Sequence, residues 1–123
     1  MSETAPETRT PDCIFCRIVR GELGTEFVAE SEHNVAFRDL QPQAPVHVLI
    51  VPRKHVAALR AIEAGDGAMT ADALSLAVRV AAAQGLMQGG YRVITNDGED
   101  AGQTVSHLHF HLLGGGKLQA GLG

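Results

Sequence analysis

Three of the chain's six histidines stand two residues apart near its end, at His107, His109 and His111. Side chains two residues apart on a β-strand point to the same face of a sheet. A strand over residues 105–113 would therefore present three imidazoles on one face. The residues between and after these histidines are apolar and would face the core: Leu108, Phe110 and Leu112. The pattern predicts a strand with one reactive face and one buried face.

A row of imidazoles is suited to chemistry at phosphorus. A neutral imidazole nitrogen can attack phosphorus and form a covalent intermediate, while neighbouring imidazoles orient it, share protons and stabilise developing charge. Histidine titrates near neutral pH, so this chemistry needs little adjustment of the pKa. For the three histidines alone, two alternatives stay open: coincidental exposure on a sheet face, or an adventitious metal site.

The elements that must position this strand form a small α+β domain. Apolar residues at helical spacing predict one long helix from about residue 70 to 88, with Thr70 as N-cap and Gly89 after its end. Its apolar stripe is predicted to contain Leu74, Ala77, Val78, Ala81 and Ala82. A short helix is predicted over 13–20. The predicted strands are 26–30, 34–39, 45–52, 91–95 and 105–113. This composition favours an antiparallel sheet of about five strands.

The composition limits the domain count and the partners of the chain. Its 123 residues, 45% of them hydrophobic, suffice for one domain, which we place at residues 12–116. Residues 1–11 are predicted to be a disordered lead-in, and 117–123 a flexible tail. A net charge of −4 without a basic cluster argues against a long nucleic acid as partner. No apolar run is long enough for a membrane span or a secretory signal, so we expect no membrane partner and a cytoplasmic location.

The sequence is similar to a known family around the three histidines. Residues 102–115 (Gly-Gln-Thr-Val-Ser-His-Leu-His-Phe-His-Leu-Leu-Gly-Gly) resemble the signature of the histidine-triad (HIT) family, and most closely its Hint branch of nucleoside phosphoramidases. Further segments match in order and approximate spacing: residues 14–18, 35–39, 42–47 and 51–55. The resemblance covers residues 13–116. It implies a HIT-like fold and a homodimer that pairs through the long helix and the strand after Gly90.

The resemblance implies roles for four histidines. His109 would be the nucleophile and would form a nucleotidyl-histidine intermediate that water hydrolyses. His111 would contact the α-phosphate and hold charge there. His107 would orient the nucleophile or ligate a metal, and His47 would lie behind the nucleophile and orient it. For His107 and His47, the alternative is a buried structural histidine with a satisfied hydrogen bond.

The resemblance also implies a set of nucleotide-binding residues. The phosphate would be lined by Asn96, Gly102, Gln103 and Thr104. The carboxylate of Asp39 would accept hydrogen bonds from the ribose diol. The base would lie in an apolar cleft formed by Ile14, Phe15, Ile18, Phe37 and Leu40. The alternatives are an ordinary surface loop, a turn residue and plain core packing, respectively.

Cys13 and Cys16 form a C-x-x-C pair, which offers two metal ligands. The resemblance implies a structural zinc site of two thiolates and two imidazoles, completed by His47 and His107. Such a site would be closed and would fix the short helix against the sheet, whereas catalysis itself would require no cofactor. Reduced thiols, or a disulfide formed on oxidation, remain alternatives.

The resemblance implies a hydrolase that acts on a purine nucleotide conjugate. It would release AMP or GMP from a nucleoside 5′-phosphoramidate or a related nucleotidyl conjugate. Two alternatives stay open: a dinucleoside polyphosphate hydrolase, and a nucleotide-binding or interaction module without catalysis. The ending of the motif at residues 112–115 favours the Hint branch. Residues 117–123 lack the bulky side chains that Hint proteins often carry there, so the leaving group stays open.

Overall fold

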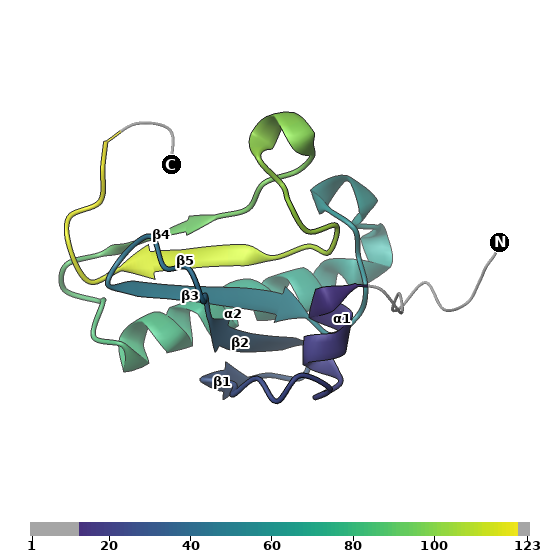
Figure 1. Ribbon diagram of the computed structural model, residues 1–123, viewed down its shortest axis with the longest axis horizontal. Coiled ribbons are helices and arrows are strands. Elements are labelled where there is room, and N and C mark those ends of the chain that lie inside the picture. Colours follow the sequence, from purple (N-terminus) through teal and green to yellow (C-terminus); the bar gives the residue numbers. More distant parts are fainter. Residues whose placement is uncertain (1–12, 121–123) are drawn as a thin grey trace, which may run out of the picture.

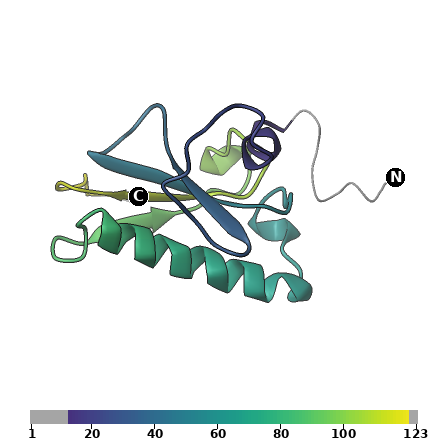
Figure 2. The same ribbon diagram turned by 90° about the horizontal axis from the view of Figure 1, so that it is seen from below.

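A computed structural model describes residues 13–120, which form one antiparallel sheet with helices on both of its faces (Figure 1). One long helix covers one face, and a short helix lies on the opposite face (Figure 2). The α+β class, the five-stranded antiparallel sheet and the long and short helices are therefore confirmed. The predicted lead-in at 1–11 and the last three residues of the predicted tail lie outside the described residues.

All five predicted strands are present, although each is shorter than predicted. Their bounds are β1 Ala29–Glu30, β2 Asn34–Arg38, β3 Val46–Pro52, β4 Tyr91–Ile94 and β5 Phe110–Gly114. They lie in the order β1-β2-β3-β5-β4, and every neighbouring pair is antiparallel. The central strand β3 is a run of β-branched and apolar residues that is buried on both faces, because helices cover both sides of the sheet there.

The long helix, α2, spans Gly67–Ala83, so it begins and ends earlier than predicted. Thr70 is not its N-cap, because its hydroxyl donates to the carbonyl of Asp66 within the first turn. A short 3₁₀ helix with a capping box, Ala64–Asp66, precedes α2 instead. Gly85 ends the helix in the left-handed conformation, with a φ of +77°. Across residues 13–120, no helix has both the length and the apolar character that a membrane span requires.

The apolar stripe of α2 is rotated from the predicted one. The predicted stripe is only partly buried, since Leu74 and Val78 are 47% and 46% exposed and Ala82 is exposed as well. Ala77 and Ala81 of this stripe are buried. The buried face contains Met69, Ala73, Leu76, Ala77, Val80 and Ala81. The sequence leaves open whether the predicted stripe faces the core, because two apolar stripes run along this helix and only packing against the sheet decides which one is buried.

The short helix, α1, spans Ile14–Val19 on the face of the sheet opposite α2. Cys13 is its N-cap, and the Sγ of Cys13 accepts the N–H of Cys16 at 3.4 Å. The helix covers β2 and β3 with a second apolar cluster: Phe15, Ile18, Val35, Phe37, Leu49 and Val51. Burial of this cluster anchors the C-x-x-C pair on the sheet.

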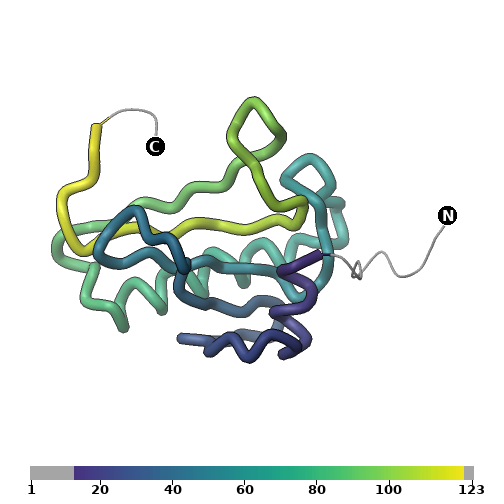
Figure 3. The backbone as a smooth tube through the Cα atoms, in the orientation of Figure 1, coloured from purple at the N-terminus to yellow at the C-terminus, as the bar shows by residue number. Residues whose placement is uncertain are grey.

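Two connecting segments, 53–66 and 95–109, approach each other at one end of the sheet (Figure 3). The N–H of Leu108 donates to the carbonyl of Val56 at 2.6 Å. The side-chain amide of Gln103 donates to the carbonyl of Ala57 at 2.8 Å. These hydrogen bonds hold the segment that leads into the triad and contains its first two histidines against the chain that follows β3.

Candidate active site

The three histidines lie where a loop enters β5. The strand begins at Phe110, so only His111 belongs to it, and the predicted strand start at residue 105 is wrong. The carbonyl of His109 accepts a hydrogen bond from the hydroxyl of Thr95 at 2.7 Å instead of joining the ladder. Residues 105–109 leave the sheet because their hydrogen bonds go to loop segments rather than to a neighbouring strand.

The predicted alternation of side chains holds even before the strand begins. The apolar residues of the motif pack into the core under α2: Leu108, Phe110 and Leu112. The rings of His107 and His109 both meet the ring of Phe15 edge-on, with centroids 5.9 and 5.0 Å apart. The rings of His109 and His111 lie 5.1 Å apart. The three imidazoles therefore form one row on the α1 side of the sheet.

His109 presents a free lone pair on one ring nitrogen. Its Nδ1 lies 2.7 Å from the carbonyl oxygen of His107. A carbonyl can only accept, so Nδ1 carries the hydrogen and donates it, and the lone pair of the neutral ring is on Nε2. Burial lowers the pKa of His109, which keeps the ring neutral near pH 7. His109 is thus in the form that can attack phosphorus.

His111 presents the complementary group, an N–H donor. The backbone N–H of Gln43 donates to Nδ1 of His47 at 3.0 Å, so the hydrogen of neutral His47 is on Nε2. That hydrogen is donated to Nδ1 of His111 at 2.9 Å, which leaves the hydrogen of His111 itself on Nε2. Burial, with smaller contributions from His109 and His47, lowers the pKa of His111 to about 4. His111 is therefore also neutral near pH 7.

The position of His47 corrects its predicted role behind the nucleophile. Its ring packs against His111, with centroids 5.1 Å apart, and its Nε2 lies 3.4 Å from Oδ2 of Asp39. In the sheet, His47 lies opposite Leu113, and His111 is the next residue of β5 on the same face. His47 therefore orients His111, whereas a backbone carbonyl orients His109.

Asp39 lies at the end of β2 beside these imidazoles. Its Oδ1 accepts the backbone N–H of Gln41 at 2.8 Å, and its Oδ2 faces His47. Each carboxylate oxygen has two lone pairs, and the side chain is partly exposed, so Asp39 can accept further hydrogen bonds from a ligand. Its negative charge also favours the protonated forms of His109 and His111 and so opposes the effect of their burial.

The loop over residues 96–104 contains the predicted phosphate ligands and leads along the chain into the triad. Gly98 and Gly102 flank a 3₁₀ helix, Glu99–Ala101, and have φ values of +92° and +88° that other residues rarely adopt. Asn96, before the turn, is partly exposed. The glycines let the loop fold back sharply toward the histidines.

Gln103 closes this loop rather than offering free donors. Its Oε1 accepts the N–H of Gly98 at 2.8 Å, and its Nε2 donates to the carbonyls of Ala57 and Val105 at 2.8 and 3.0 Å. Its backbone N–H donates to the carbonyl of Gly98. Since all of its donors are engaged, Gln103 is a positioning residue in this arrangement rather than the predicted phosphate donor. Thr104 beside it is exposed.

The residues predicted to bind the base divide into two groups. Phe15, Ile18 and Phe37 are buried in the cluster between α1 and the sheet. Ile14 and Leu40 are 47% and 96% exposed. The first group matches the alternative of core packing, and the second leaves apolar side chains available to a ligand.

Comparison with known proteins assigns this arrangement to a family. The model of the HIT domain matches residues 20–118. The chain belongs to the HIT family. This HIT protein is 44% identical over 105 residues to an uncharacterized HIT-like protein of Chlamydia trachomatis, with 85% of this chain and 94% of that protein covered.

Solved structures similar to this HIT protein include two HIT family hydrolases. The hydrolase from Legionella pneumophila has a TM-score of 0.85 and 42% identity, covering 88% of this chain and 96% of that chain. The hydrolase from Clostridium thermocellum has a TM-score of 0.89 and 41% identity, covering 93% of this chain and 99% of that chain. These neighbours support a hydrolase-type HIT protein.

A second cluster beside the triad contains both cysteines. The ligand atoms of Cys13, Cys16, His55 and His107 all lie within 4.8 Å of one another. The two Nδ1 atoms are 3.2 Å apart, and Nδ1 of His107 lies 3.3 and 3.5 Å from the sulfur atoms of Cys13 and Cys16. Tetrahedral zinc with bonds of about 2.0–2.3 Å sets its ligand atoms roughly 3.3–3.8 Å apart. The donor set and its spacing fit a structural zinc ion.

The predicted ligand His47 is not in this cluster, and His55 stands in its place. The cluster lies at the far end of β3 from His47, where Nε2 of His107 donates to the carbonyl of Pro52 at 2.9 Å. A strand that rises about 3.3 Å per residue separates the two ends by roughly 16 Å, so His47 cannot reach. Sequence reasoning gave His55 no role. Its place three residues after the strand end was the available signal.

The two histidine clusters differ in where their hydrogens are. In the cysteine cluster, the hydrogen bond from Nε2 to Pro52 leaves the Nδ1 lone pair of His107 free for a metal. Burial lowers the pKa of His107 to about 4 and keeps that lone pair available. Asp39, His47 and His111 also converge, but Nε2 of His47 carries a hydrogen there. The second group is therefore a proton network rather than a metal site.

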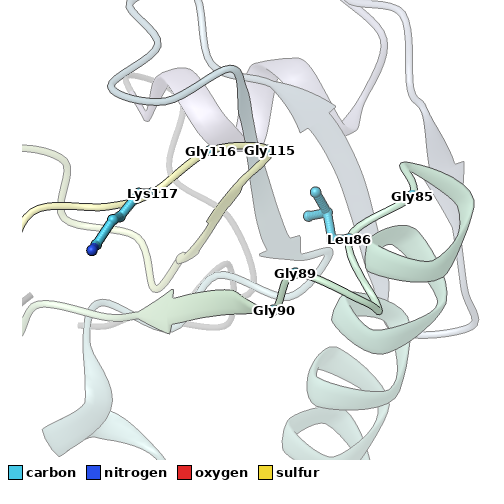
Figure 4. Close-up of a pocket in the computed structure, with 7 residues that line it drawn as sticks. All are labelled: Gly85, Leu86, Gly89, Gly90, Gly115, Gly116 and Lys117. Atoms are coloured by element: carbon cyan, nitrogen blue, oxygen red, sulfur yellow. The ribbon is translucent and has the colours of Figure 1, made fainter.

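A cavity of about 500 Å³ lies away from both clusters, beyond the end of α2 (Figure 4). It is lined by Gly85, Leu86, Gly89, Gly90, Gly115, Gly116 and Lys117. None of the predicted site residues lines it. Most of its wall is backbone, because five of its residues are glycines, so it offers few groups for recognition.

Proposed function

We propose that this HIT protein releases a nucleoside monophosphate from a nucleoside 5′-phosphoramidate through a covalent intermediate on His109. The observation that carries the proposal is the complementary protonation of two neighbouring imidazoles. His109 presents a lone pair on Nε2, and His111 presents an N–H donor on Nε2. One ring can attack phosphorus while the other donates to a phosphate oxygen on which charge develops.

The reaction takes two displacements at phosphorus. In the first, Nε2 of His109 bonds to phosphorus and the bond to the leaving nitrogen breaks, and the departing amine takes up a proton. In the second, water adds to phosphorus and the bond to His109 breaks, which releases AMP or GMP. The ring of the intermediate is positively charged, and the carbonyl of His107 stabilises it by accepting the Nδ1–H.

The proposed nucleotide extends from the triad toward Asp39. The ribose diol donates to the Asp39 carboxylate, which is partly exposed and lies beside His47. The purine contacts the exposed apolar side chains of Ile14 and Leu40. The phosphate lies against the loop before the triad, at Asn96, Gly102 and Thr104. Gln103 supports this loop from behind through its internal hydrogen bonds.

The test of the proposal is AMP release from adenosine 5′-phosphoramidate. We expect turnover by the wild type and a loss of several orders of magnitude in His109→Ala, because the covalent route is then closed. His33→Ala is the control, since this partly exposed histidine lies in the turn between β1 and β2. Absence of release by the wild type would contradict the proposal and favour a binding module.

The dinucleoside polyphosphate alternative is tested with the same enzyme. We expect the phosphoramidate to have a higher kcat/KM than a diadenosine polyphosphate. The reverse order would favour the alternative, in which a nucleotide rather than an amine leaves. The non-catalytic alternative is supported if the biological effect of the protein survives in His109→Ala.

We also propose that the cysteine cluster holds a structural zinc ion through Cys13, Cys16, His55 and His107. The support is the fit of its ligand distances and the free lone pair of His107. Bound zinc would supply four bonds that join α1 to the segment after β3 and to the triad. The HIT domain match begins at residue 20, after both cysteines, so this proposal rests on the donor geometry of this chain.

We further propose a homodimer that pairs through α2 and β4. Leu74 and Val78 form an exposed apolar stripe on α2, and Val93 on β4 is exposed as well. β4 is an edge strand, so one side of its backbone has no neighbouring strand within residues 13–120. An exposed apolar stripe and an open strand edge are features that a second copy would cover.

A further inference from the structure

His111 and Asp39 compete for one hydrogen atom, which His47 carries. The backbone N–H of Gln43 occupies Nδ1 of His47, so the single hydrogen of this neutral ring is on Nε2. Two acceptors face that hydrogen: Nδ1 of His111 at 2.9 Å and Oδ2 of Asp39 at 3.4 Å. One N–H cannot form a full hydrogen bond to both acceptors. A group that binds Asp39 therefore changes the hydrogen bond that His111 receives from His47.

The acceptor that takes this hydrogen decides what His111 presents to a substrate. When Nδ1 of His111 accepts it, the hydrogen of His111 stays on Nε2, where it can donate. When Asp39 takes it, His111 can carry its hydrogen on either nitrogen. A carboxylate is a stronger acceptor than an imidazole, and apart from His47 the partner of Asp39 within residues 13–120 is the N–H of Gln41, which donates to Oδ1. Without a ligand, Asp39 is therefore a real competitor.

We infer that ribose hydroxyls bound to Asp39 hold His111 in its donor form through His47. Asp39 is then a positioning residue that couples recognition of the sugar to the chemical step. The inference rests on the proposed function, which places the ribose at Asp39. Two donating hydroxyls satisfy the carboxylate, so Oδ2 no longer draws the hydrogen of His47. The preferred substrates are ribonucleotide conjugates, and the sugar acts on kcat as well as on KM.

The first experiment compares adenosine 5′-phosphoramidate with its 2′,3′-dideoxy analogue in single turnovers at saturating substrate. With the wild type, we expect the maximal rate to fall roughly three- to tenfold for the dideoxy substrate, about the effect of one weakened hydrogen bond in the transition state. If the sugar contact served binding alone, its loss in the dideoxy substrate would raise KM and leave the maximal rate unchanged. An unchanged maximal rate would therefore overturn the inference.

The Asp39→Ala variant gives the sharper result. The variant removes the competing acceptor. With the dideoxy substrate, we therefore expect Asp39→Ala to have a higher maximal rate than the wild type. That rate should equal the rate of the wild type with the ribose substrate. Loss of the negative charge of Asp39 near the phosphate would also speed the reaction, but this electrostatic effect does not depend on His47. The gain should therefore disappear when Asp39→Ala is made in a His47→Ala background. A gain that persists there, or no gain at all, contradicts the inference.

An NMR measurement separates this inference from the proposed function. In protein with ¹⁵N-labelled histidine, the ring shifts of His111 report which nitrogen carries the hydrogen. We expect saturating adenosine to increase the Nε2–H form of His111, and 2′,3′-dideoxyadenosine to leave it unchanged. This readout needs no turnover, so it decides the inference even if the phosphoramidate is not cleaved. Equal responses to the two nucleosides, or none to adenosine, would overturn it.

Discussion

Backbone groups decide which nitrogen of each site histidine carries a hydrogen. The carbonyls of His107 and Pro52 can only accept, and the amide of Gln43 can only donate. The hydrogen positions of His109, His107 and His47 follow directly, and that of His111 follows from His47. The rings of His107, His109 and His47 are therefore arranged before any substrate binds, which lowers the reorganisation required in the reaction.

The depressed pKa of His111 predicts activity well into the acidic range. Because burial lowers the pKa of both His109 and His111, the latter to about 4, we expect the acidic limb of kcat to lie below the ordinary histidine value of about 6.5. A pH profile of kcat at saturating phosphoramidate checks this. An acidic limb centred near 6.5, the ordinary value for histidine, would contradict it.

The lowered pKa of His111 also reduces the free energy of unfolding in acid, so the pH profile of kcat needs a control for unfolding. The folded-state pKa of His111 lies below the unfolded value, so the unfolded chain binds more protons between pH 6.5 and 4. The stabilisation present above pH 6.5 is lost as the pH falls through the folded pKa. Urea unfolding at each pH shows where the protein remains folded, and only those points enter the activity profile.

Two histidines near opposite ends of β3 provide a matched test of the zinc proposal. His55 lies in the cysteine cluster, and His47 lies in the proton network. We expect about one equivalent of zinc in the wild type and in His47→Ala, and far less in His55→Ala, because four ligands are needed for a closed site. Metal analysis of the purified proteins checks this. Loss of zinc in His47→Ala, with zinc retained in His55→Ala, would instead support the ligand set predicted from the resemblance, in which His47 takes the place of His55.

At the scale of elements, short segments between the strands carry most of the site. The segment after β3 supplies His55 and the carbonyls of Val56 and Ala57, which bond the chain before the triad. The loop over residues 96–104 is closed by Gln103. Val56 and Ile62 pack the first of these segments into the apolar core, and hydrogen bonds and the proposed metal help to define the positions of the rest.

Replacing Gln103 by glutamate tests how the loop is closed. In Gln103→Glu the carboxylate can still accept from Gly98, but it faces the carbonyls of Ala57 and Val105 without a hydrogen to donate. We expect a loss of about 1–3 kcal/mol in the free energy of unfolding, together with faster amide exchange at Gly98. Urea unfolding and hydrogen exchange measure these. The control is Gln119→Glu in the exposed tail, and equal effects would contradict the closure.

At the scale of the whole molecule, the two faces of the sheet have different tasks. The face under α2 is the larger apolar core and supports β5 from behind. The opposite face carries α1 (Figure 2), and the cysteine cluster and the row of imidazoles lie on the same side. The strand β3 joins the two sides because its alternate residues pack into both clusters. The proposed chemistry is thus anchored to the best-packed part of the molecule.

The exposed stripe of α2 predicts the oligomeric state. We expect the wild type at micromolar concentration to have twice the chain mass by light scattering, and Val78→Glu to be monomeric because it places a charge in the apolar interface. Circular dichroism must show that the variant is folded. The exposed charge change Glu32→Lys, on the turn between β1 and β2, is the control. A monomeric wild type, or a Val78→Glu variant that stays dimeric, would contradict the proposal.

The sequence by itself determined the elements and the chemical character of the site. Alternation of apolar and polar residues is a local property, so it predicted five strands and the common face of the three imidazoles. The motif at residues 102–115 predicted the family, which the comparisons show. The C-x-x-C spacing also predicted that the cysteines act together, and both lie in one ligand cluster.

Only the tertiary structure decided how groups distant in the sequence meet. It buried Leu76 rather than Leu74, because packing against the sheet selects one of two apolar stripes. It joined His55 rather than His47 to the cysteines, because β3 separates the two histidines. The hydrogen positions also depend on partners far along the chain, such as Pro52 for His107. Local patterns carry no information about such contacts, since these arise only when the sheet and its loops assemble.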